Sequence, residues 1–333
     1  MAKILVTGGT GFLGSYLLYY LTNNNEKPIA IKRKNSSFKT IKNIFISQGD
    51  SNLELFKNIE WKEIDILDYY NIGEAMKGID IIFHSAAMVS FNSKNKEKIL
   101  ETNYYATKNL INFSLINNVS KFCYVSSVAT LSKDINQEVF NEESWFSWSD
   151  RKSNYAISKY LAETEVWRGF AEGLNGFIIN PSLIIGPGDD NGLFPNLIKK
   201  LKNISLFFPR GSSGFVDVRD VAQIILKLEK LNVKHERYII NAYNKSFKEV
   251  ISFFSKKFNS REPSIPINRG LIKIYLLFSI IYNFILNKKT LISTEMLEFI
   301  DGKLNYCNKK IKRKLDYKFI KFEKSLEDTL KEK

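Results

Sequence analysis

Apolar and polar positions along the first 130 residues follow two different periods. Short apolar runs predict buried strands at 3–9, 28–33, 59–66, 80–87 and 121–130. Apolar positions at helical spacing predict helices at 14–23, 72–78 and 98–118. Strands that alternate with helices form βαβ units, so the pattern predicts an α/β fold with a doubly wound parallel sheet and helices on both faces.

The pattern changes in the second half of the chain. A further strand is predicted at 175–188, after which Pro and Gly interrupt the sequence and helical patterns dominate from 245 onward. RYIINAY at 237–243 is a candidate strand that returns to the sheet. We therefore expect two parts. The sheet domain comprises 1–180 with a return segment near 214–243, and a smaller, mostly helical C-terminal substrate lobe comprises 181–213 and 244–333.

The most apolar stretch, residues 270–286, is shorter than the ~20 residues that span a bilayer, and Lys273 interrupts it. It predicts a helix buried in the smaller lobe. The alternative is weak membrane association through 270–289, which the flanking Lys288 and Lys289 favour.

Charge and cysteine content narrow the classes of function. The formal charge of +14 permits nucleic-acid binding, but the lysines are spread along the chain without a recognised motif, so we expect no nucleic-acid partner. Two cysteines make no disulfide framework, and no His/Cys cluster suggests a metal. The opening residues, MAKILVTGG, already resemble a strand and a turn rather than a secretory signal, so we expect a cytoplasmic location.

The segment TGGTGFLG at 7–14 joins the first strand to the first helix. Gly8 permits the tight turn, Gly11 lets backbone amides approach a pyrophosphate, and Gly14 lets the helix pack close to the sheet. The helix N-terminus then offers unpaired N–H groups to phosphates. In this strand–turn–helix context the glycines predict a dinucleotide site.

The end of the second strand indicates which dinucleotide binds. A carboxylate there would bind the ribose 2′-hydroxyl of NAD, but this chain has Lys32, Arg33 and Lys34. Positive charge suits a 2′-phosphate, which favours NADP and leaves NAD as the alternative.

SNYAISKYLAE at 153–163 places Tyr155 and Lys159 four residues apart, on one face of a predicted helix. Alone, this spacing fits either a solvated helix face or a proton-transfer pair. An ammonium near the phenol favours the phenolate and lowers the phenol's pKa, so Lys159 is placed to tune Tyr155.

Together these features resemble the extended short-chain dehydrogenase/reductase superfamily, which includes the NAD-dependent epimerase/dehydratase family, from residue 3 to about 330. The matching motifs are TGGTGFLG, DIL at 65–67, HSAA at 84–87, Asn103, YVSS at 124–127, YxxxK at 155–159, NPSLIIGPG at 180–188, GFVDVRDVA at 214–222 and the ending at 312–330. The chain looks most like the dihydroflavonol-reductase and 3β-hydroxysteroid-dehydrogenase-like branch. Leu183 and Ser213 stand where sugar-nucleotide epimerases usually carry Asn and Arg, and VAT follows Ser127 where sugar dehydratases carry an Asp-Glu pair.

The resemblance implies roles for individual residues. Tyr155 is the expected proton donor, Lys159 its partner that also reaches the nicotinamide ribose, Ser127 the group that orients the substrate oxygen, and Asn103 a relay or positioning group behind Lys159. Ser126 is expected to face the cofactor, because adjacent strand residues point to opposite sides. His84 is expected to be packed rather than catalytic. The expected cofactor-binding residues are Gly8, Thr10, Gly11, Phe12, Leu13, Gly14, Arg33, Lys34, Asp65, Ile66, Ser85, Ala86, Ala87, Ser126, Tyr155, Lys159, Pro181 and Ser182.

The predicted function is an NAD(P)-dependent oxidoreductase that transfers a hydride between the nicotinamide and a carbonyl or secondary alcohol of a small, fairly apolar substrate. The alternatives are a sugar-nucleotide epimerase or dehydratase with retained NAD, and a non-catalytic NADP-binding sensor. The resemblance also implies a homodimer formed through the helices that carry Asn103 and Tyr155.

Overall fold

The computed structural model describes residues 2–90, 92–132, 138–149, 153–188, 206–267 and 302–331 of the 333-residue chain. The apolar segment 270–289 lies outside these residues, as does much of the expected substrate lobe. No helix in the described part is long and apolar enough to cross a membrane.

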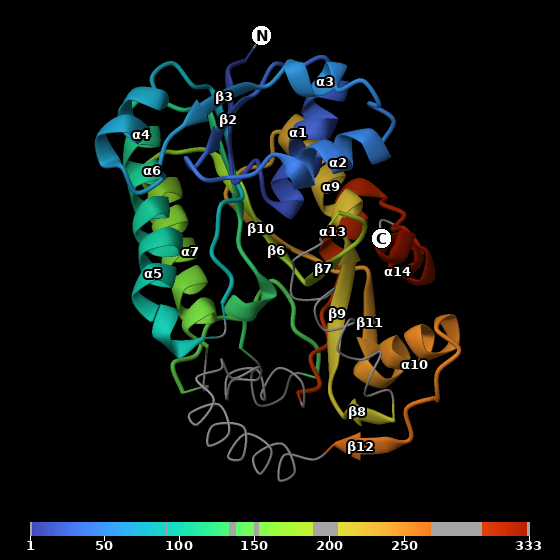
Figure 1. Ribbon diagram of the computed structural model, residues 1–333. Coiled ribbons are helices and arrows are strands. Elements are labelled where there is room, and N and C mark those ends of the chain that lie inside the picture. Colours follow the sequence, from blue (N-terminus) through green and yellow to red (C-terminus); the bar gives the residue numbers. More distant parts are fainter. Residues whose placement is uncertain are drawn as a thin grey trace, which may run out of the picture.

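The centre of the molecule is a seven-stranded sheet in the order β10-β6-β5-β4-β1-β2-β3 (Figure 1). Each neighbouring pair is parallel, which confirms the predicted doubly wound sheet. Its strands are β1 (Ile4–Thr7), β2 (Ile29–Lys32), β3 (Glu60–Glu63), β4 (Ile81–His84), β5 (Lys121–Val125), β6 (Gly176–Pro181) and β10 (Glu236–Ile240). The order reverses between β1 and β4, and this type of sheet binds ligands in the crevice beyond the carboxyl ends of strands at that point.

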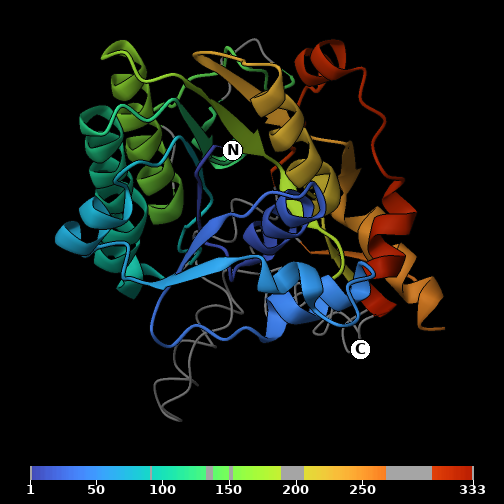
Figure 2. The ribbon, with the colours of Figure 1, turned by 90° about the horizontal axis from the view of Figure 1, so that it is seen from above.

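Helices cover both faces of this sheet, as Figure 2 shows from above. One face carries α1 (Phe12–Asn23), α2 (Lys39–Ser47), α9 (Val218–Lys230) and α13 (Lys309–Leu315), and the other carries α4 (Tyr69–Ala75), α6 (Ala106–Ile116) and α7 (Asn154–Ala171). Strand residues alternate between the two cores, because Ile4 and Val6 pack in one and Leu5 packs in the other. Two helices between β2 and β3, α2 and the short α3 (Glu54–Lys57), were not predicted.

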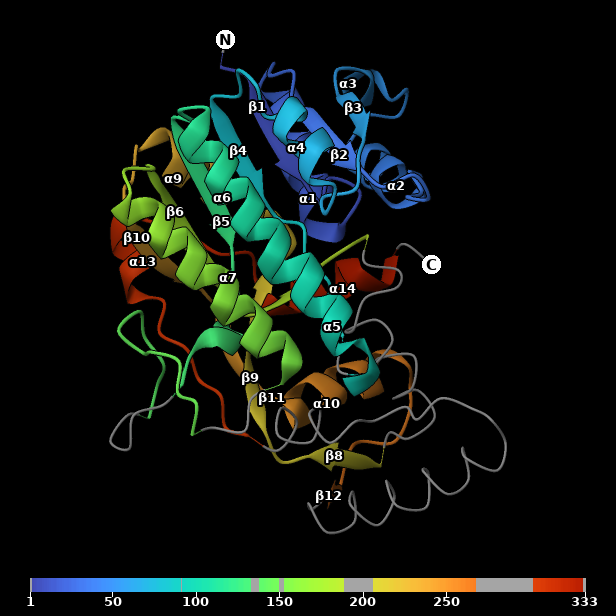
Figure 3. The ribbon, with the colours of Figure 1, turned by 90° about the vertical axis from the view of Figure 1, so that its left-hand side faces the viewer.

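The helix predicted at 98–118 is a composite that runs beside α7 in Figure 3. It consists of α5 (Lys96–Leu100), a π-helical turn (Glu101–Tyr105) and α6. A 3-10 turn (Ser93–Asn95) precedes it. Single π turns inside α-helices occur frequently at functional sites, and this one carries Asn103.

The strand predicted at 175–188 is divided between two sheets. β6 belongs to the large sheet, whereas β7 (Leu183–Ile185) belongs to a three-stranded sheet in the order β11-β9-β7. The chain changes sheet at Ser182, whose N–H donates to the carbonyl of Ile240 at 3.0 Å. The remaining elements are β8 (Phe207–Pro209), β9 (Ser212–Asp217), β11 (Tyr243–Ser246), α10 (Phe247–Lys257), β12 (Ile265–Ile267) and α14 (Phe322–Lys331).

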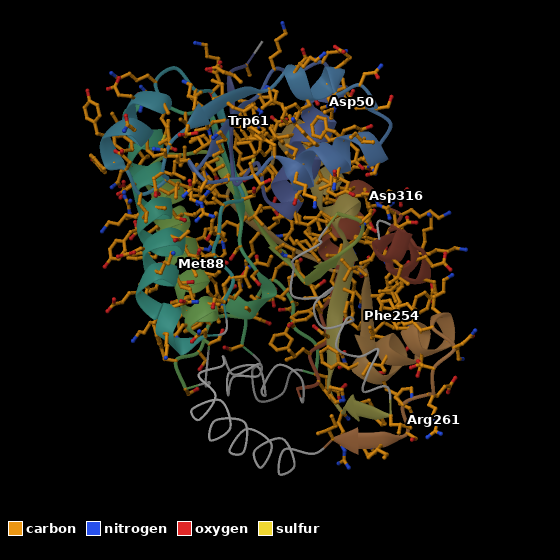
Figure 4. The ribbon with its side chains drawn as sticks, in the orientation of Figure 1. Asp50, Trp61, Met88, Phe254, Arg261 and Asp316 are labelled. Carbon is orange, nitrogen blue, oxygen red and sulfur yellow. The ribbon has the colours of Figure 1, made fainter. Side chains whose placement is uncertain are left out.

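The small sheet has a core of its own, in which Phe215 and Phe322 pack with Phe254 from α10, labelled in Figure 4. α9 packs beside α1, and β10 is the edge strand of the large sheet next to β6. The described part of the region beyond β6 therefore contains strands as well as helices.

Candidate active site

The glycine loop between β1 and α1 is built so tightly that side chains are excluded. Gly8 has φ of +73°, and a Cβ there would lie 2.7 Å from the Ala86 nitrogen. A Cβ on Gly14 would lie 2.1 Å from the Gly8 carbonyl oxygen. The Gly11 N–H closes the turn by donating to that same oxygen at 2.9 Å. These contacts bring the loop, the first turn of α1 and the HSAA segment together at the switch point of the sheet.

The first turn of α1 has the features of an anion-binding helix end. Its N-cap, Gly11, has no side-chain cap, and the turn carries no acidic residue. Backbone N–H groups at such a helix end lack intrahelical partners and attract anions. The residues present therefore fit the pyrophosphate of a dinucleotide.

Two further loops border this crevice. The Ser85 hydroxyl donates to the Thr7 carbonyl at 2.7 Å, and the Ala86 N–H donates to the Thr7 hydroxyl at 3.3 Å. Asp65 is exposed, and one of its carboxylate oxygens accepts from the Leu67 N–H at 3.0 Å. The other carboxylate oxygen is available to a ligand at the expected adenine position.

The three cations after β2 differ in their surroundings. Lys32 forms an ion pair with Glu63. Arg33 and Lys34 are exposed, and neither forms an ion pair within the described part of the chain. Arg33 and Lys34 are therefore the residues available to a 2′-phosphate.

His84 is fully buried at the end of β4 and is hydrogen-bonded on both ring nitrogens. Its Nδ1 lies 2.7 Å from the Thr7 hydroxyl and its Nε2 lies 2.8 Å from the Thr107 hydroxyl. Burial lowers the pKa of His84 to about 3, with a further contribution from the charge of Lys159. A neutral, packed histidine of this kind matches the expectation that it takes no direct part in chemistry.

The end of β5 carries Ser126 and Ser127, and the two hydroxyls have different partners. Ser126, expected to face the cofactor, donates its hydroxyl to the Glu163 carboxylate at 2.6 Å, so this side chain points towards α7. Its orientation follows from the buried carboxylate, which requires donors. Ser127 is half-buried, and its Oγ accepts from the Ala129 N–H at 3.2 Å.

Tyr155 and Lys159 lie one turn apart on α7, as predicted. Burial raises the pKa of the Tyr155 phenol, and a hydrogen bond with the Ser127 side chain opposes that rise. Lys159 is 1 % exposed, its Nζ donates to the Val125 carbonyl at 2.7 Å, and it lies over the Tyr124 ring. Burial lowers the pKa of Lys159 to about 7, opposed by the charge of Glu163.

These directions differ from the expected tuning, in which Lys159 lowers the pKa of Tyr155. The groups that shift this phenol are the buried surroundings and Ser127, whereas the lysine ammonium is held by a strand carbonyl. A phenol whose pKa is raised stays protonated at neutral pH, as a proton donor must, but it is a weaker acid than an ordinary tyrosine.

Asn103, buried in the π-helical turn, connects the loop after β4 to α7. Its Oδ1 accepts from the Met88 N–H at 2.7 Å, and its Nδ2 donates to the Met88 carbonyl at 3.0 Å and to Ser158 Oγ at 2.9 Å. Met88 is labelled in Figure 4. These bonds use both amide hydrogens, and the structure gives the Asn103 side chain a positioning contact and no direct bond to Lys159.

Pro181 and Ser182, expected beside the nicotinamide, are both buried at the end of β6. The Ser182 hydroxyl donates to the Ile240 carbonyl at 3.3 Å. This bond holds the crossing point between the two sheets beside β10.

One part of the site was not predicted. Ser126, Thr130, Glu163, Asn180 and Arg237 form a buried polar group, which we name the Glu163 cluster. Glu163 lies four residues beyond Lys159, and its position on the same helix face was a signal present in the sequence. Arg237, 74 residues further along the chain, gave no such signal.

Comparison with known proteins agrees with this geometry. The model of the NAD dependent epimerase/dehydratase family matches residues 4–242. Sterol demethylase protein B of Methylococcus capsulatus is 24% identical over 276 residues, covering 81% of this chain and 78% of the relative. Dihydroflavonol 4-reductase of Solanum lycopersicum is 26% identical over 268 residues, covering 76% and 69%.

Solved structures share the fold over almost the whole chain. The crystal structure of gox2253 has a TM-score of 0.79 at 25% identity and covers 99% of this chain and 97% of that one. The dTDP-glucose 4,6-dehydratase DesIV of Streptomyces venezuelae, a double mutant solved with NAD bound, has a TM-score of 0.75 at 18% identity and covers 98% and 95%.

The glycine loop, the Ser127–Tyr155–Lys159 arrangement and the family match together identify the class of protein. The chain belongs to the NAD dependent epimerase/dehydratase family and is an NAD(P)-dependent enzyme of the extended short-chain dehydrogenase/reductase type.

Proposed function

We propose that the chain is an NADP-dependent reductase that acts on a ketone or aldehyde of a small, fairly apolar molecule. The observation that carries the proposal is the hydrogen bond between the side chains of Tyr155 and Ser127 at the end of β5. Lys159 is held nearby, because its Nζ donates to the carbonyl of Val125, two residues before Ser127. When bound, the nicotinamide supplies the hydride. The relatives named as reductases are consistent with this direction of reaction.

The chain's own groups have separate tasks in this proposal. Ser127 donates a hydrogen bond to the carbonyl oxygen and orients it. Tyr155 gives its phenolic proton to that oxygen as negative charge develops there. Lys159, one turn along α7, stabilises the phenolate that remains until a proton from solvent restores the phenol.

The apolar nature of the substrate is argued from the small sheet. Leu183, at the position where sugar-nucleotide epimerases usually carry Asn, packs against the core of the small sheet. Ser213 is buried at the position where they usually carry Arg. Neither side chain supplies a cation or amide for a diphosphate, which argues against a sugar nucleotide.

NADP preference is argued from Arg33 and Lys34, which are exposed and without ion pairs among the described residues. A guanidinium binds a phosphate bidentately, so Arg33 is the stronger candidate for the 2′-phosphate.

The test is NADPH consumption with a panel of apolar ketones and aldehydes. Tyr155→Phe is expected to lower kcat by about 10²–10⁴-fold, far more than it weakens NADPH binding. Tyr160→Phe, on the same helix but stacked on Phe146 away from the site, serves as the control. Full turnover by Tyr155→Phe would contradict the mechanism.

The competing functions give different results in the same preparation. Mass spectrometry of the released cofactor would find retained NAD in an epimerase, together with no net NADPH consumption. A sensor would bind NADPH tightly and reduce no carbonyl in the panel.

A further inference from the structure

Glu163 is a carboxylate in the interior of the molecule that the proposed reaction does not use. It is 3% exposed, and both of its oxygens are occupied. Oε2 accepts from Ser126 Oγ at 2.6 Å and from Asn180 Nδ2 at 3.0 Å, and Oε1 pairs with Arg237 Nη1 at 3.2 Å. A buried charge is expensive unless it is paired and hydrogen-bonded, and this one has both kinds of partner.

The position of Glu163 on α7 relates it to the catalytic pair. Tyr155, Lys159 and Glu163 follow at four-residue intervals, which places them on one face of the helix. Lys159 Nζ donates a hydrogen bond to the Val125 carbonyl. The Glu163 carboxylate accepts a hydrogen bond from the hydroxyl of Ser126, the residue after Val125. Two successive turns of α7 are thereby attached to two successive residues of the β5 end.

The same cluster fixes the residue that follows. The Ser127 carbonyl accepts from Asn180 Nδ2 at 3.0 Å and from the Thr130 hydroxyl at 2.9 Å. Asn180 Nδ2 also lies 3.0 Å from Glu163 Oε2. The backbone of Ser127 is therefore held by groups that depend on the Glu163 carboxylate.

The charges around Lys159 come from several elements. His84 on β4 is neutral because burial lowers its pKa to about 3. Tyr124 on β5 and Tyr155 on α7 are neutral because burial raises the pKa of each phenol. Glu163 is the group whose charge favours the Lys159 ammonium.

Arg237, on β10, balances the charge of Glu163 and is itself held in place. It donates to the Glu142 carbonyl at 2.8 Å and 2.6 Å and to the Ser144 carbonyl at 2.7 Å, and it lies 4.9 Å from the Trp145 ring centroid. Because these contacts direct Arg237 at Oε1, the guanidinium stays on the side of the carboxylate away from Ser126, Thr130 and Asn180.

We infer that Glu163, paired with Arg237, is a positioning residue that stabilises the ammonium of Lys159 and fixes the end of β5 that carries Ser127. This inference rests on the proposed function, since Lys159 and Ser127 are assigned their roles there. Glu163 itself touches neither Tyr155 nor the reacting atoms in this scheme.

The decisive experiment is the pH profile of kcat for carbonyl reduction in wild type and Glu163→Gln. If the Lys159 ammonium is required, activity falls as pH rises through the pKa of Lys159. Loss of the neighbouring negative charge lowers that pKa, so the fall is expected about one pH unit lower in the variant. The kcat at pH 7.5 then drops about tenfold, whereas the two profiles converge at acidic pH.

The matched control is Glu165→Gln, which removes a carboxylate from the same helix. Glu165 pairs with the half-buried Arg168 and lies off the Lys159 face, so the pH profile of Glu165→Gln is expected to match wild type. If Glu163→Gln does not fold because Arg237 is left unpaired, the double variant Glu163→Gln/Arg237→Gln removes both charges. It is expected to show a smaller acidward shift, because loss of the Arg237 positive charge acts in the opposite direction on the pKa of Lys159. A uniform loss of kcat at every pH, with an unchanged apparent pKa, would overturn the inference and leave Glu163 a purely structural residue.

A second measurement needs no turnover and separates this inference from the proposed function. Urea unfolding of wild type and Lys159→Met across pH reports the ionisation of Lys159 in the folded state. The same comparison is then made with Glu163→Gln added to both proteins. The pH at which their unfolding free energies begin to diverge is expected to be about one unit lower. Coincident curves would refute the inference even if the enzyme reduces carbonyls. A shifted onset would support the charge effect even if no carbonyl in the panel is reduced.

Discussion

The glycine loop follows β1, and the Glu163 cluster begins after β5, which β4 separates from β1 in the same sheet; the two regions are built by opposite means. The loop consists of backbone packed so closely that Gly14 has no room for a Cβ. The Glu163 cluster consists of side chains drawn from β5, α7, β6 and β10. The proposed phosphate-binding surface depends on the absence of side chains. The proposed proton-transfer groups are instead held in place by side chains that hydrogen-bond to one another.

The largest effect that we predict is the destabilisation of the Glu163 cluster. Arg237→Met leaves the Glu163 carboxylate buried without its counter-ion, which typically costs about 3–5 kcal/mol of unfolding free energy. Urea unfolding at pH 7 measures it. Arg168→Met, on the same helix as Glu163 but 34% exposed, is expected to cost less than about 1 kcal/mol. Equal losses in the two variants would show that the burial of the pair is unimportant.

The next largest effect is expected when the glycine loop is disrupted. In Gly14→Ala the new Cβ meets the Gly8 carbonyl, so the backbone must shift, at a cost of about 1–3 kcal/mol. Because the shift deforms the phosphate-binding turn, NADPH affinity, measured by fluorescence titration, is also expected to fall. Gly49→Ala is the control, since Gly49 has φ of +106° but open space around it. It should lose stability through strain and keep the affinity for NADPH.

The same contrast explains what the sequence could predict. Gly8, Gly11 and Gly14 are local, and exclusion of a Cβ leaves a direct mark on residue type, so the loop was predicted with its neighbours. The four-residue spacing of Tyr155 and Lys159 likewise followed from helix geometry. These predictions needed no knowledge of which segments meet in space.

Contacts between segments far apart in the chain could not be predicted from local sequence patterns. The Glu163–Arg237 pair joins positions 74 residues apart, and each is an ordinary polar residue in its own segment. The contact between Ser126 and Glu163 was not predicted, because strand alternation defines two sides of a strand without showing which segment lies on each. The change of sheet at Ser182 depends on the Ile240 carbonyl, so one apolar run was read as one strand.

A smaller effect, on cofactor affinity, is expected from a residue at the rim of the glycine loop. Arg33→Ala is expected to weaken NADPH binding about 10- to 30-fold and to leave NADH binding unchanged, because only NADPH carries the 2′-phosphate. Lys230→Ala, an exposed lysine at the end of α9, controls for general loss of positive charge. Equal weakening for both cofactors would show that Arg33 does not recognise the 2′-phosphate.

The last effect concerns how the two regions respond to pH. The glycine loop carries no titrating side chain, whereas Lys159 has a pKa of about 7 when folded, against ~10.4 for an unperturbed lysine. Between these values the unfolded chain binds the extra proton, so this group makes the unfolding free energy rise with pH, by at most about 1.4 kcal/mol per pH unit. Below pH 7 both states are protonated and the slope disappears. The difference between wild type and Lys159→Met in urea unfolding should therefore be flat at acidic pH and grow in favour of wild type above pH 7. A difference that stays constant from pH 6 to 9 would mean that Lys159 stays protonated in the folded state and keeps its ordinary pKa, so the burial described here would not govern its charge.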